Sequence, residues 1–375
     1  MKTKTMKKVV AMFSMVAVSV ATMGLSVTVA ATPNIGTNLT SDTSGGAAPI
    51  VKAKWEANVD RYTDALTDAG AQFMPSGQYQ VNTTIAICAI VTDPDGLADV
   101  NNVYADVFYP ENIAVGDSHV KLPTQDGSDT AGCGVLMQED VLTRLDKAAG
   151  IELFCDLVRN NNNNLPTFNP NGLYDYDEIC GETGELEKDT AAVYCGEKEI
   201  SYEDPSGDYE VWAVGQDANG LQGILENHFT YLPLTAFETD FSTVSYGNVR
   251  LNTHKIIPGD LTWDAMNQGK ASVRNVGNTR LAMNVRQDDM GLGTTSGVSN
   301  VIYDARVGSD APYAVYNPEV TTPLLNYLGL SELNEMDFSV EISKFPPTHT
   351  GDVYIGEMVL TATFVEHLEC CVTGC

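Results

Sequence analysis

The chain has 375 residues, 43% of them hydrophobic, and carries 50 Asp and Glu residues against 21 Lys and Arg residues. This length favours two domains over one large core, and the apolar content is sufficient for folded cores of ordinary size. The formal net charge of −29 repels phosphate backbones and argues against a nucleic-acid partner.

The N-terminus has the pattern of a secretory signal peptide. Four lysines precede an apolar stretch from Val9 to about Val29, which ends in small residues at Ala30 and Ala31. Residues 1–31 are therefore predicted to be a signal peptide, and their removal takes the net charge to −33 because all four charges are lysines. The stretch is also long enough to remain as an uncleaved anchor, the only membrane attachment that we expect. The pattern predicts a secreted, extracellular protein.

Residues 32–48 are rich in Thr, Ser, Gly and Asn, a composition typical of a flexible segment. Two triplets match the acceptor pattern for N-linked glycosylation, one at Asn38 and one at Asn82. In an exported protein both are candidate glycosylation sites, although such triplets also arise by chance.

Period-two alternation predicts β-strands in residues 49–234, the first expected domain. Every second residue from Tyr79 to Val91 faces one side, mostly with apolar side chains, and the alternation resumes from Val103 to Tyr109 after a turn at residues 93–96. Another turn, at residues 217–220, predicts a closing hairpin.

A helical pattern interrupts these strands. Apolar residues recur at three- and four-residue spacing from Val141 to Val158, which predicts a helix within an insertion over about residues 131–200. Asp175, Asp177 and Glu178 in this insertion fit an acidic helix start, where the helix dipole favours carboxylates, or an ion site.

The second expected domain covers residues 235–367. Alternation from Arg280 to Arg286 and from Met358 to Phe364 predicts strands with one solvent-facing side. A short helix is expected around Pro323 to Leu333. Residues 368–375 form a cysteine-rich C-terminal tail.

Eight cysteines in an exported chain indicate disulfides. Five lie in the first half and three in the tail, so full oxidation requires at least one bridge from the tail to the first domain or a bridge between subunits. The sequence leaves the connectivity open, and it disfavours zinc because no Cys-x-x-Cys pair exists. The disulfide candidates are Cys88, Cys133, Cys155, Cys180, Cys195, Cys370, Cys371 and Cys375.

Four aspartates form the strongest candidate for a metal-binding site. Asp93, Asp95 and Asp99 surround a turn, and Asp217 is expected at the same end of the domain. Carboxylates are hard ligands that suit Ca²⁺, although the spacing is not that of an EF-hand. The alternative interpretation is that Asp-Pro-Asp-Gly is simply a favourable turn.

Several segments resemble known surface modules. Residues 93–100, 207–211 and 217–220 are similar to bacterial and archaeal immunoglobulin-like modules, and residues 275–281 and 354–362 resemble sandwich modules of archaeal cell-surface and S-layer-type proteins. The resemblance implies exported structural or adhesive modules. We therefore expect a mainly β protein with two immunoglobulin-like antiparallel β-sandwich domains, the first with a disulfide-bearing helical insertion.

These patterns lead to one functional hypothesis. We expect a non-enzymatic cell-surface structural protein, an envelope, filament or adhesion component, whose partners are further copies of itself or other surface proteins. Calcium bound by acidic loops would relieve self-repulsion and bridge subunits. In one version, residues 32–51 add as a strand to the edge of the next subunit. The acidity also fits life in high salt.

Two alternatives stay open. A carbohydrate- or ligand-binding module would need exposed aromatic residues, for which Trp55, Trp212 and Trp263 are candidates. A secreted hydrolase would need a cleft with two carboxylates or a nucleophile beside a histidine. No hydrolase motif supports it. The histidines are His119, His228, His254, His349 and His367.

Overall fold

The structure is a computed structural model. It describes residues 46–58, 72–111, 113–114, 134, 136–156, 176–264, 270–346, 353–366 and 368–369. The expected signal peptide and residues 32–45 lie outside the described residues. None of the helices in the described part of the chain has the length and apolar character that a bilayer crossing requires.

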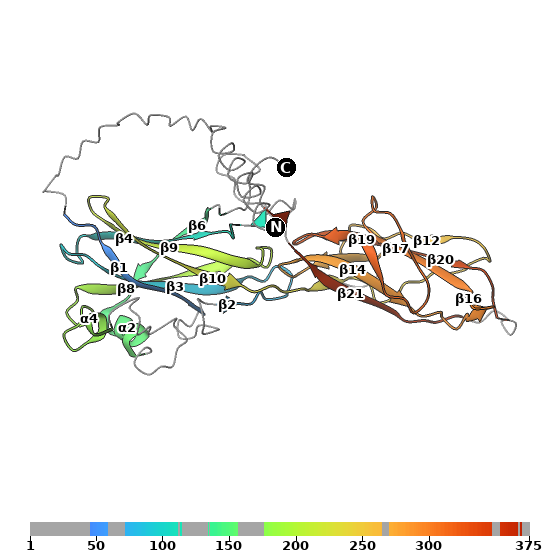
Figure 1. Cartoon of the computed structure of the whole chain (residues 1–375), viewed down its shortest axis with the longest axis horizontal. Helices are drawn as coiled ribbons and strands as arrows, with labels where there is room; N and C mark the ends of the chain where they lie inside the picture. Colours follow the sequence, from blue (N-terminus) through green and yellow to red (C-terminus); the bar gives the residue numbers. More distant parts are fainter. Residues whose placement is uncertain are drawn as a thin grey trace, which may run out of the picture. The chain divides into compact units, whose positions relative to one another are not determined.

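The first sandwich consists of two sheets, with strand orders β1-β3-β8-β7 and β2-β10-β9-β4-β6 (Figure 1). All pairings are antiparallel except that of β10 with the short β2. The strands up to β10 are β1 Ile50–Asn58, β2 Gln72–Phe73, β3 Thr83–Thr92, β4 Val100–Phe108, β5 Ile113–Ala114, β6 Leu136–Val141, β7 Thr143–Arg144, β8 Ala191–Ile200, β9 Gly207–Asp217 and β10 Gln222–Tyr231.

Every second side chain along these strands points inward, and these side chains fill the space between the two sheets. On β9, for example, Tyr209, Val211 and Ala213 are buried in the core while the residues between them are half-buried. Strand β3 differs because it is buried on both faces from Ile85 to Thr92. Its second face packs against the insertion, which forms a third layer.

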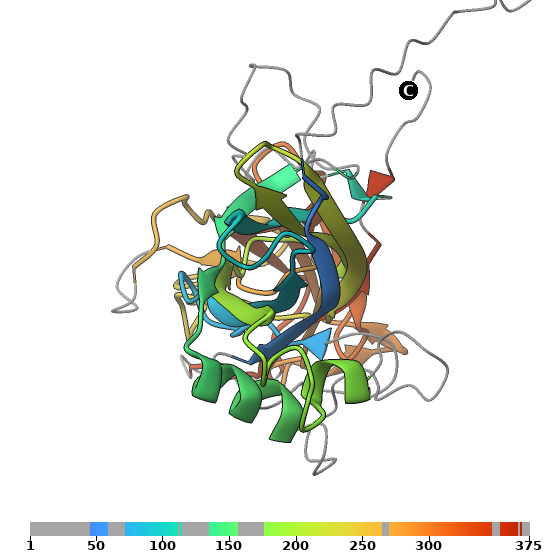
Figure 2. The same cartoon turned by 90° about the vertical axis from the view of Figure 1, so that its left-hand side faces the viewer.

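The insertion contains α2 Lys147–Ile151, the π-helix η1 Glu152–Asp156 and α4 Tyr176–Cys180, which cover the outer side of the β1-β3-β8-β7 sheet (Figure 2). Asp146 caps α2 by accepting a 2.9 Å hydrogen bond from the Ala149 N–H. The expected helix start at Val141 is wrong, because Val141 ends β6 in the sandwich. The insertion is also shorter than residues 131–200, since β6 and β8 both belong to the sheets.

Two disulfides lie among the described residues. Cys88 and Cys195 are direct partners in the β3–β8 ladder, and Cys155–Cys180 joins η1 to α4. The described cysteines therefore pair within the first sandwich and its insertion. The other four candidates, Cys133, Cys370, Cys371 and Cys375, lie outside the described residues.

The second sandwich consists of a sheet in the order β11-β13-β20-β17-β18, with β12 also paired to β20, and of the sheet β19-β14-β21. The short β15 and β16 pair with each other, and β22 pairs with β5. The strands from β11 are β11 Phe237–Thr239, β12 Lys255–Ile257, β13 Ser272–Asn275, β14 Arg280–Gln287, β15 Thr294–Thr295, β16 Val298–Ser299, β17 Val301–Val307, β18 Ala314–Tyr316, β19 Thr322–Leu328, β20 Leu333–Ile342, β21 Met358–Val365 and β22 Leu368–Glu369.

The helix expected around Pro323 to Leu333 is wrong. This segment contains β19, which pairs with β14, and then turns into β20. Leu324 and Leu328 of β19 point into the core, and the exposed Leu325 created the false helical spacing. The expected fold class is confirmed: the chain is mainly β, with two antiparallel sandwiches and a disulfide-bearing helical insertion in the first.

Candidate functional site

The predicted aspartates lie at one end of the first sandwich. Asp93 follows β3 directly, and its Oδ1 accepts a 2.7 Å hydrogen bond from the Asp95 N–H. The Gly96 N–H donates to the Asp93 carbonyl at 3.0 Å, and Gly96 has a φ of 108°, which a side chain would strain. The turn thus folds as the sequence predicted and turns several carboxylates toward one point.

Asp93, Asp95 and Asp99 each offer a ligand oxygen, and these oxygens lie within 4.8 Å of one another. Asp217 joins them from the last residue of β9. It pairs with Val100 in the β4–β9 ladder, and the N–H after it, from Ala218, donates to the Asp99 carbonyl at 2.9 Å. The structure therefore brings all four predicted residues to the same end of the sandwich.

Two of these carboxylates are buried and only half satisfied. Asp93 is 4% exposed and Asp217 is 1% exposed. Oδ1 of Asp217 accepts the N–H groups of Asn219 and Leu221, at 2.8 and 2.7 Å. The Oδ2 atoms of Asp93 and Asp217, in contrast, are buried without any hydrogen-bond partner. A buried, unpartnered carboxylate oxygen is costly, so each requires a partner such as a bound cation.

The electrostatics of the cluster point the same way. Burial, together with the negative charges of Asp217, Asp93 and Asp95, raises the pKa of Asp99. Asp93, Asp95 and Asp99 are close enough to repel one another, and the charge of Asp217 adds to this repulsion, unless a cation or a proton intervenes. An oxygen-only donor set fits a hard ion such as Ca²⁺.

The cluster also contacts the beginning of the described chain. Oδ2 of Asp95 accepts a 2.6 Å hydrogen bond from the Ala47 N–H. Gly46, with a φ of 71°, approaches so closely that an added Cβ would lie 2.9 Å from the same oxygen. The entry of the N-terminal segment into the sandwich is thus coupled to the acidic turn. No local pattern in the sequence predicts this contact.

The second acidic cluster is a helix start. Asp177 and Glu178 lie in the first turn of α4, and Lys52 on β1 forms a 2.7 Å ion pair with Glu178 and a 3.3 Å pair with Glu185. These pairs attach the insertion to the sheet. Asp175 lies outside the described residues.

One glycosylation candidate is described. Asn82 is exposed just before β3, where its Nδ2 donates a 3.1 Å hydrogen bond to Glu199. The position is accessible to a modifying enzyme before folding and to solvent afterwards. Asn38 lies outside the described residues.

The three tryptophans form no exposed platform. Trp55 is 2% exposed and packs against Phe154 of the insertion. Trp212 is half-buried on the outer face of β9 with Phe108, at a ring-centroid distance of 4.9 Å. Trp263 is half-buried beneath the guanidinium of Arg274, 3.7 Å from the ring centroid. Of the three tryptophans, only Trp212, paired with Phe108, offers aromatic area on a sheet face.

A Ser-His-Asp contact in the second sandwich does not have the geometry of a catalytic triad. His254 Nε2 contacts both Asp304 and Ser339, the latter at 2.7 Å. A triad needs the aspartate on one imidazole nitrogen and the serine on the other, whereas here both use Nε2. Ser339 is fully buried and also donates to Asp304 at 2.8 Å. His254 itself is exposed, so the contact is a structural network at the surface of the second sandwich.

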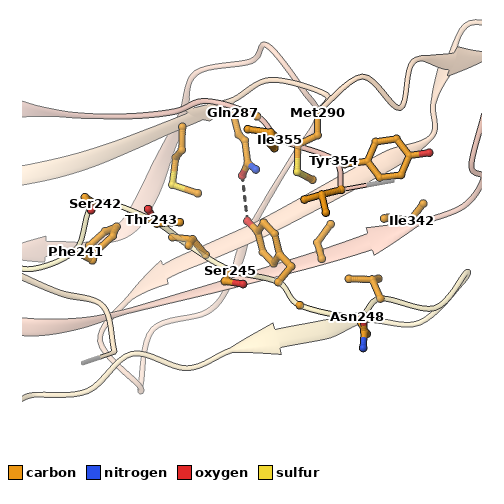
Figure 3. A pocket seen from close by; sticks show the side chains of 18 of the residues that line it. Phe241, Ser242, Thr243, Ser245, Asn248, Gln287, Met290, Ile342, Tyr354 and Ile355 are labelled. Atoms are coloured by element: carbon orange, nitrogen blue, oxygen red, sulfur yellow. Dashed lines mark hydrogen bonds between the residues drawn. The ribbon is translucent and has the colours of Figure 1, made fainter. Parts of the chain in front are cut away.

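The second sandwich contains a groove of about 1060 Å³ between residues 237–249 and residues 353–360 (Figure 3). Its described lining includes no Asp, Glu, His or Cys. Met358 and Leu360 of β21 line it. The Tyr246 hydroxyl donates a 3.1 Å hydrogen bond to Oε1 of Gln287, which is labelled in Figure 3.

No protein-family model matches the chain, and no curated protein is similar to it in sequence. Among solved structures it is similar to the C-terminal domain of the antigen I/II-family protein AspA of Streptococcus pyogenes, with a TM-score of 0.22, 12% identity, and 86% of this chain and 97% of that chain covered. A carbohydrate-binding module from the β-sandwich superfamily has a TM-score of 0.19 and 10% identity, with 86% of this chain and 99% of that chain covered. A chaperone–tip adhesin complex of CFA/I fimbriae has a TM-score of 0.24 and 7% identity, with 84% and 85% covered. Similarities this weak carry no functional argument.

Proposed function

We propose that the chain is a non-enzymatic, secreted cell-surface protein that acts as an envelope, filament or adhesion component and binds calcium. The observation that carries the proposal is the pair of buried, unpartnered oxygens on Asp93 and Asp217 beside Asp95 and Asp99. Calcium supplies the missing partner for both oxygens. The disulfides support an oxidising, extracellular setting.

A bound calcium ion would join three separate pieces of the first sandwich. Asp93, Asp95 and Asp99 belong to the turn between β3 and β4, Asp217 ends β9, and Ala47 is hydrogen-bonded to Asp95. Ca²⁺ takes six to eight oxygen ligands, and neutralising this cluster removes the repulsion among its members. Calcium thereby holds Gly46 and Ala47, where the described chain begins, against the acidic turn.

This attachment bears on assembly between copies, because residues 32–45 precede it in the sequence. In our proposal, residues 32–45 of one copy add as a strand to the edge of another. Ile50 and Val51 are not available for this, because they pair with Thr92 and Val91 in the chain's own β1–β3 ladder. Among the described strands, β21 pairs only with β14 and therefore has a free edge, next to the groove of the second sandwich.

The test is the molar mass of the mature chain, residues 31–375, measured by light scattering on a sizing column in millimolar calcium and again in chelator. We expect large assemblies with calcium and monomers without it. Asp93→Asn should remain monomeric in calcium, while Glu341→Gln, an exposed carboxylate on β20, should assemble as the wild type does. A monomer in both conditions at several concentrations contradicts calcium-driven assembly.

A carbohydrate-binding role is the second candidate. It is favoured by the Phe108–Trp212 pair, beside which Asp106, opposite Trp212 in the β4–β9 ladder, has a buried Oδ1 without a hydrogen-bond partner. Burial and the charge of Glu139 raise the pKa of Asp106. An array of immobilised glycans tests this role, with Trp212→Ala expected to abolish any signal and Trp263→Ala to preserve it.

A further inference from the structure

Three side chains meet inside the first sandwich at a place that the calcium site does not involve. Lys54 and Glu56 lie two residues apart on β1, so both face the interior, while Trp55 between them faces the insertion. Asn227 of β10 faces them from the opposite sheet. A charged pair and a carboxamide thus occupy a position that apolar residues fill elsewhere in the core.

The contacts among the three groups are direct. Lys54 Nζ contacts both Glu56 Oε1 and Asn227 Oδ1, and the Asn227 Nδ2 lies 3.5 Å from the Lys54 carbonyl. The side chains of Lys54 and Glu56 are 0% and 1% exposed. A buried ion pair gives little net stability compared with apolar residues of similar volume, so stability alone does not explain this arrangement.

We propose that Lys54 and Asn227 form an intramolecular isopeptide bond, with Glu56 as the proton-transfer group. The Lys54 Nζ attacks Asn227 Cγ, an N–C bond forms, and the bond from Cγ to Nδ2 breaks. The amide nitrogen leaves as ammonia. No oxidation or reduction occurs, and no external reactant is required.

Protons balance through Glu56. Transfer of one proton from the Lys54 ammonium to the Glu56 carboxylate leaves a neutral amine, the nucleophilic form. Nζ loses a second proton as it becomes the amide nitrogen, and Asn227 Nδ2 gains one proton to leave as ammonia. Glu56, which contacts Nζ, relays this proton and remains as a neutral carboxylic acid, the form that suits a buried group without a counter-ion.

The environment favours the reactive form of the lysine. Burial lowers the pKa of Lys54, although the nearby charges of Glu56 and Glu226 oppose this change. A lysine in such surroundings loses its proton at a lower pH than in water and becomes nucleophilic. The sandwich holds amine and carboxamide in contact, which replaces an encounter in solution by an intramolecular step.

A second cluster of an amine, a carboxamide and a carboxylate provides an internal comparison. Lys198 Nζ contacts Gln138 Oε1 and lies 3.6 Å from Asp140. Gln138, however, is exposed on β6, so water reaches the carboxamide and competes for its hydrogen bonds. We expect no bond at Lys198, and this cluster supplies a matched control.

The bond would join the first and the last long strand of the sandwich, which belong to different sheets and lie 173 positions apart. Pulling on the chain at both ends of the domain would then load the cross-link rather than the hydrogen-bonded strands between its ends. Such a cross-link suits a protein that bears tension.

The test is the intact mass of the purified mature chain after reduction and denaturation. We expect a wild-type mass below the sequence mass by one ammonia molecule, and faster migration on a denaturing gel. Glu56→Gln and Asn227→Ala should regain the missing ammonia relative to their own sequence masses. Lys198→Arg should keep the deficit. Circular dichroism shows whether each variant retains its strands.

Mapping of the cross-link completes the experiment. Proteolysis and tandem mass spectrometry should give one branched peptide that contains Lys54 and Asn227. A folded wild-type chain with its full mass overturns the proposal, as does a deficit that disappears in Lys198→Arg. If Glu56→Gln unfolds, the branched peptide from the wild type still decides the question. None of these outcomes depends on calcium binding or assembly.

Discussion

The hydroxyl of Tyr109 donates a hydrogen bond of 3.0 Å to Oδ1 of Asp204, a carboxyl group buried beside the core of the first sandwich. Oδ2 of Asp204 accepts a 2.8 Å bond from the Ser201 N–H. Burial raises the pKa of Asp204 to about 6, although these two bonds and the charge of Lys198 oppose the change. The carboxyl group therefore titrates in a range where an exposed aspartate is already ionised.

This pKa predicts the sign of a pH effect on stability. The folded state binds the proton more tightly than the unfolded state, so the contribution of Asp204 is greatest below about pH 4, falls as the pH rises to about 6, and totals about 3 kcal/mol. We would measure the free energy of unfolding in urea at both ends of this range. Relative to the wild type, the free energy of unfolding of Asp204→Asn should increase by about 3 kcal/mol as the pH rises. Parallel pH profiles of the two proteins would refute this.

Replacing Asp217 should have opposite effects with and without calcium. Asp217→Asn keeps an Oδ1 that accepts the N–H groups of Asn219 and Leu221 but removes one negative charge from the cluster. In chelator, the melting temperature should stay equal or rise because repulsion decreases. Bound calcium should stabilise the wild type by about 2.7 kcal/mol at a free calcium concentration about 100 times the Kd. The variant should lack this stabilisation. Equal calcium shifts in both proteins would argue against a site here.

The Cys155–Cys180 disulfide should contribute about 2–4 kcal/mol, because it closes a loop with a sequence separation of 25 residues. Replacing both cysteines by alanine should lower the free energy of unfolding by that amount. Limited proteolysis should then cut first within the insertion, before the sheets are attacked. Cleavage that begins in the sheets would show that the insertion does not depend on this bridge.

Phe154 should contribute more to stability than its place in a five-residue π-helix suggests. It is 1% exposed and packs against Trp55, with the ring centroids 5.3 Å apart. Phe154→Ala should cost about 3–5 kcal/mol in chemical denaturation. The matched control is Phe364→Ala on β21, where the side chain is 50% exposed and the cost should stay well below that of Phe154→Ala.

Strands with one face in a core were predictable from the sequence, because alternation is a local signal. The inward set on β9, from Tyr209 to Ala213, and the set on β14, from Leu281 to Val285, were both expected and are both buried. The helix errors have a common cause. In short segments, apolar residues on both strand faces mimic helical spacing, as the exposed Leu325 next to the buried Leu324 illustrates.

The candidate site was predictable only in part. The carboxylates and the turn around Asp93 can be recognised from a short stretch of sequence. The burial of the unpartnered Oδ2 atoms of Asp93 and Asp217 depends on neighbouring strands, and residue spacing does not reveal it. The Lys54–Glu56–Asn227 cluster was missed for the same reason. Alternating charges on a strand indicate a solvent-facing side, and the carboxamide that meets them lies 173 positions away.

The packing of the insertion on the first sandwich restricts how copies can lie beside one another. Its cluster around Phe154 occupies the outer side of the β1-β3-β8-β7 sheet, so no neighbouring molecule can rest flat against those strands. Among the described residues, no helix packs on the outer face of the sheet that contains β9, and this face carries the half-buried Trp212. This domain can therefore pack flat against a neighbour only through the sheet that contains β9. In a layer built through that face, the helices of every copy would lie on the same side of the layer.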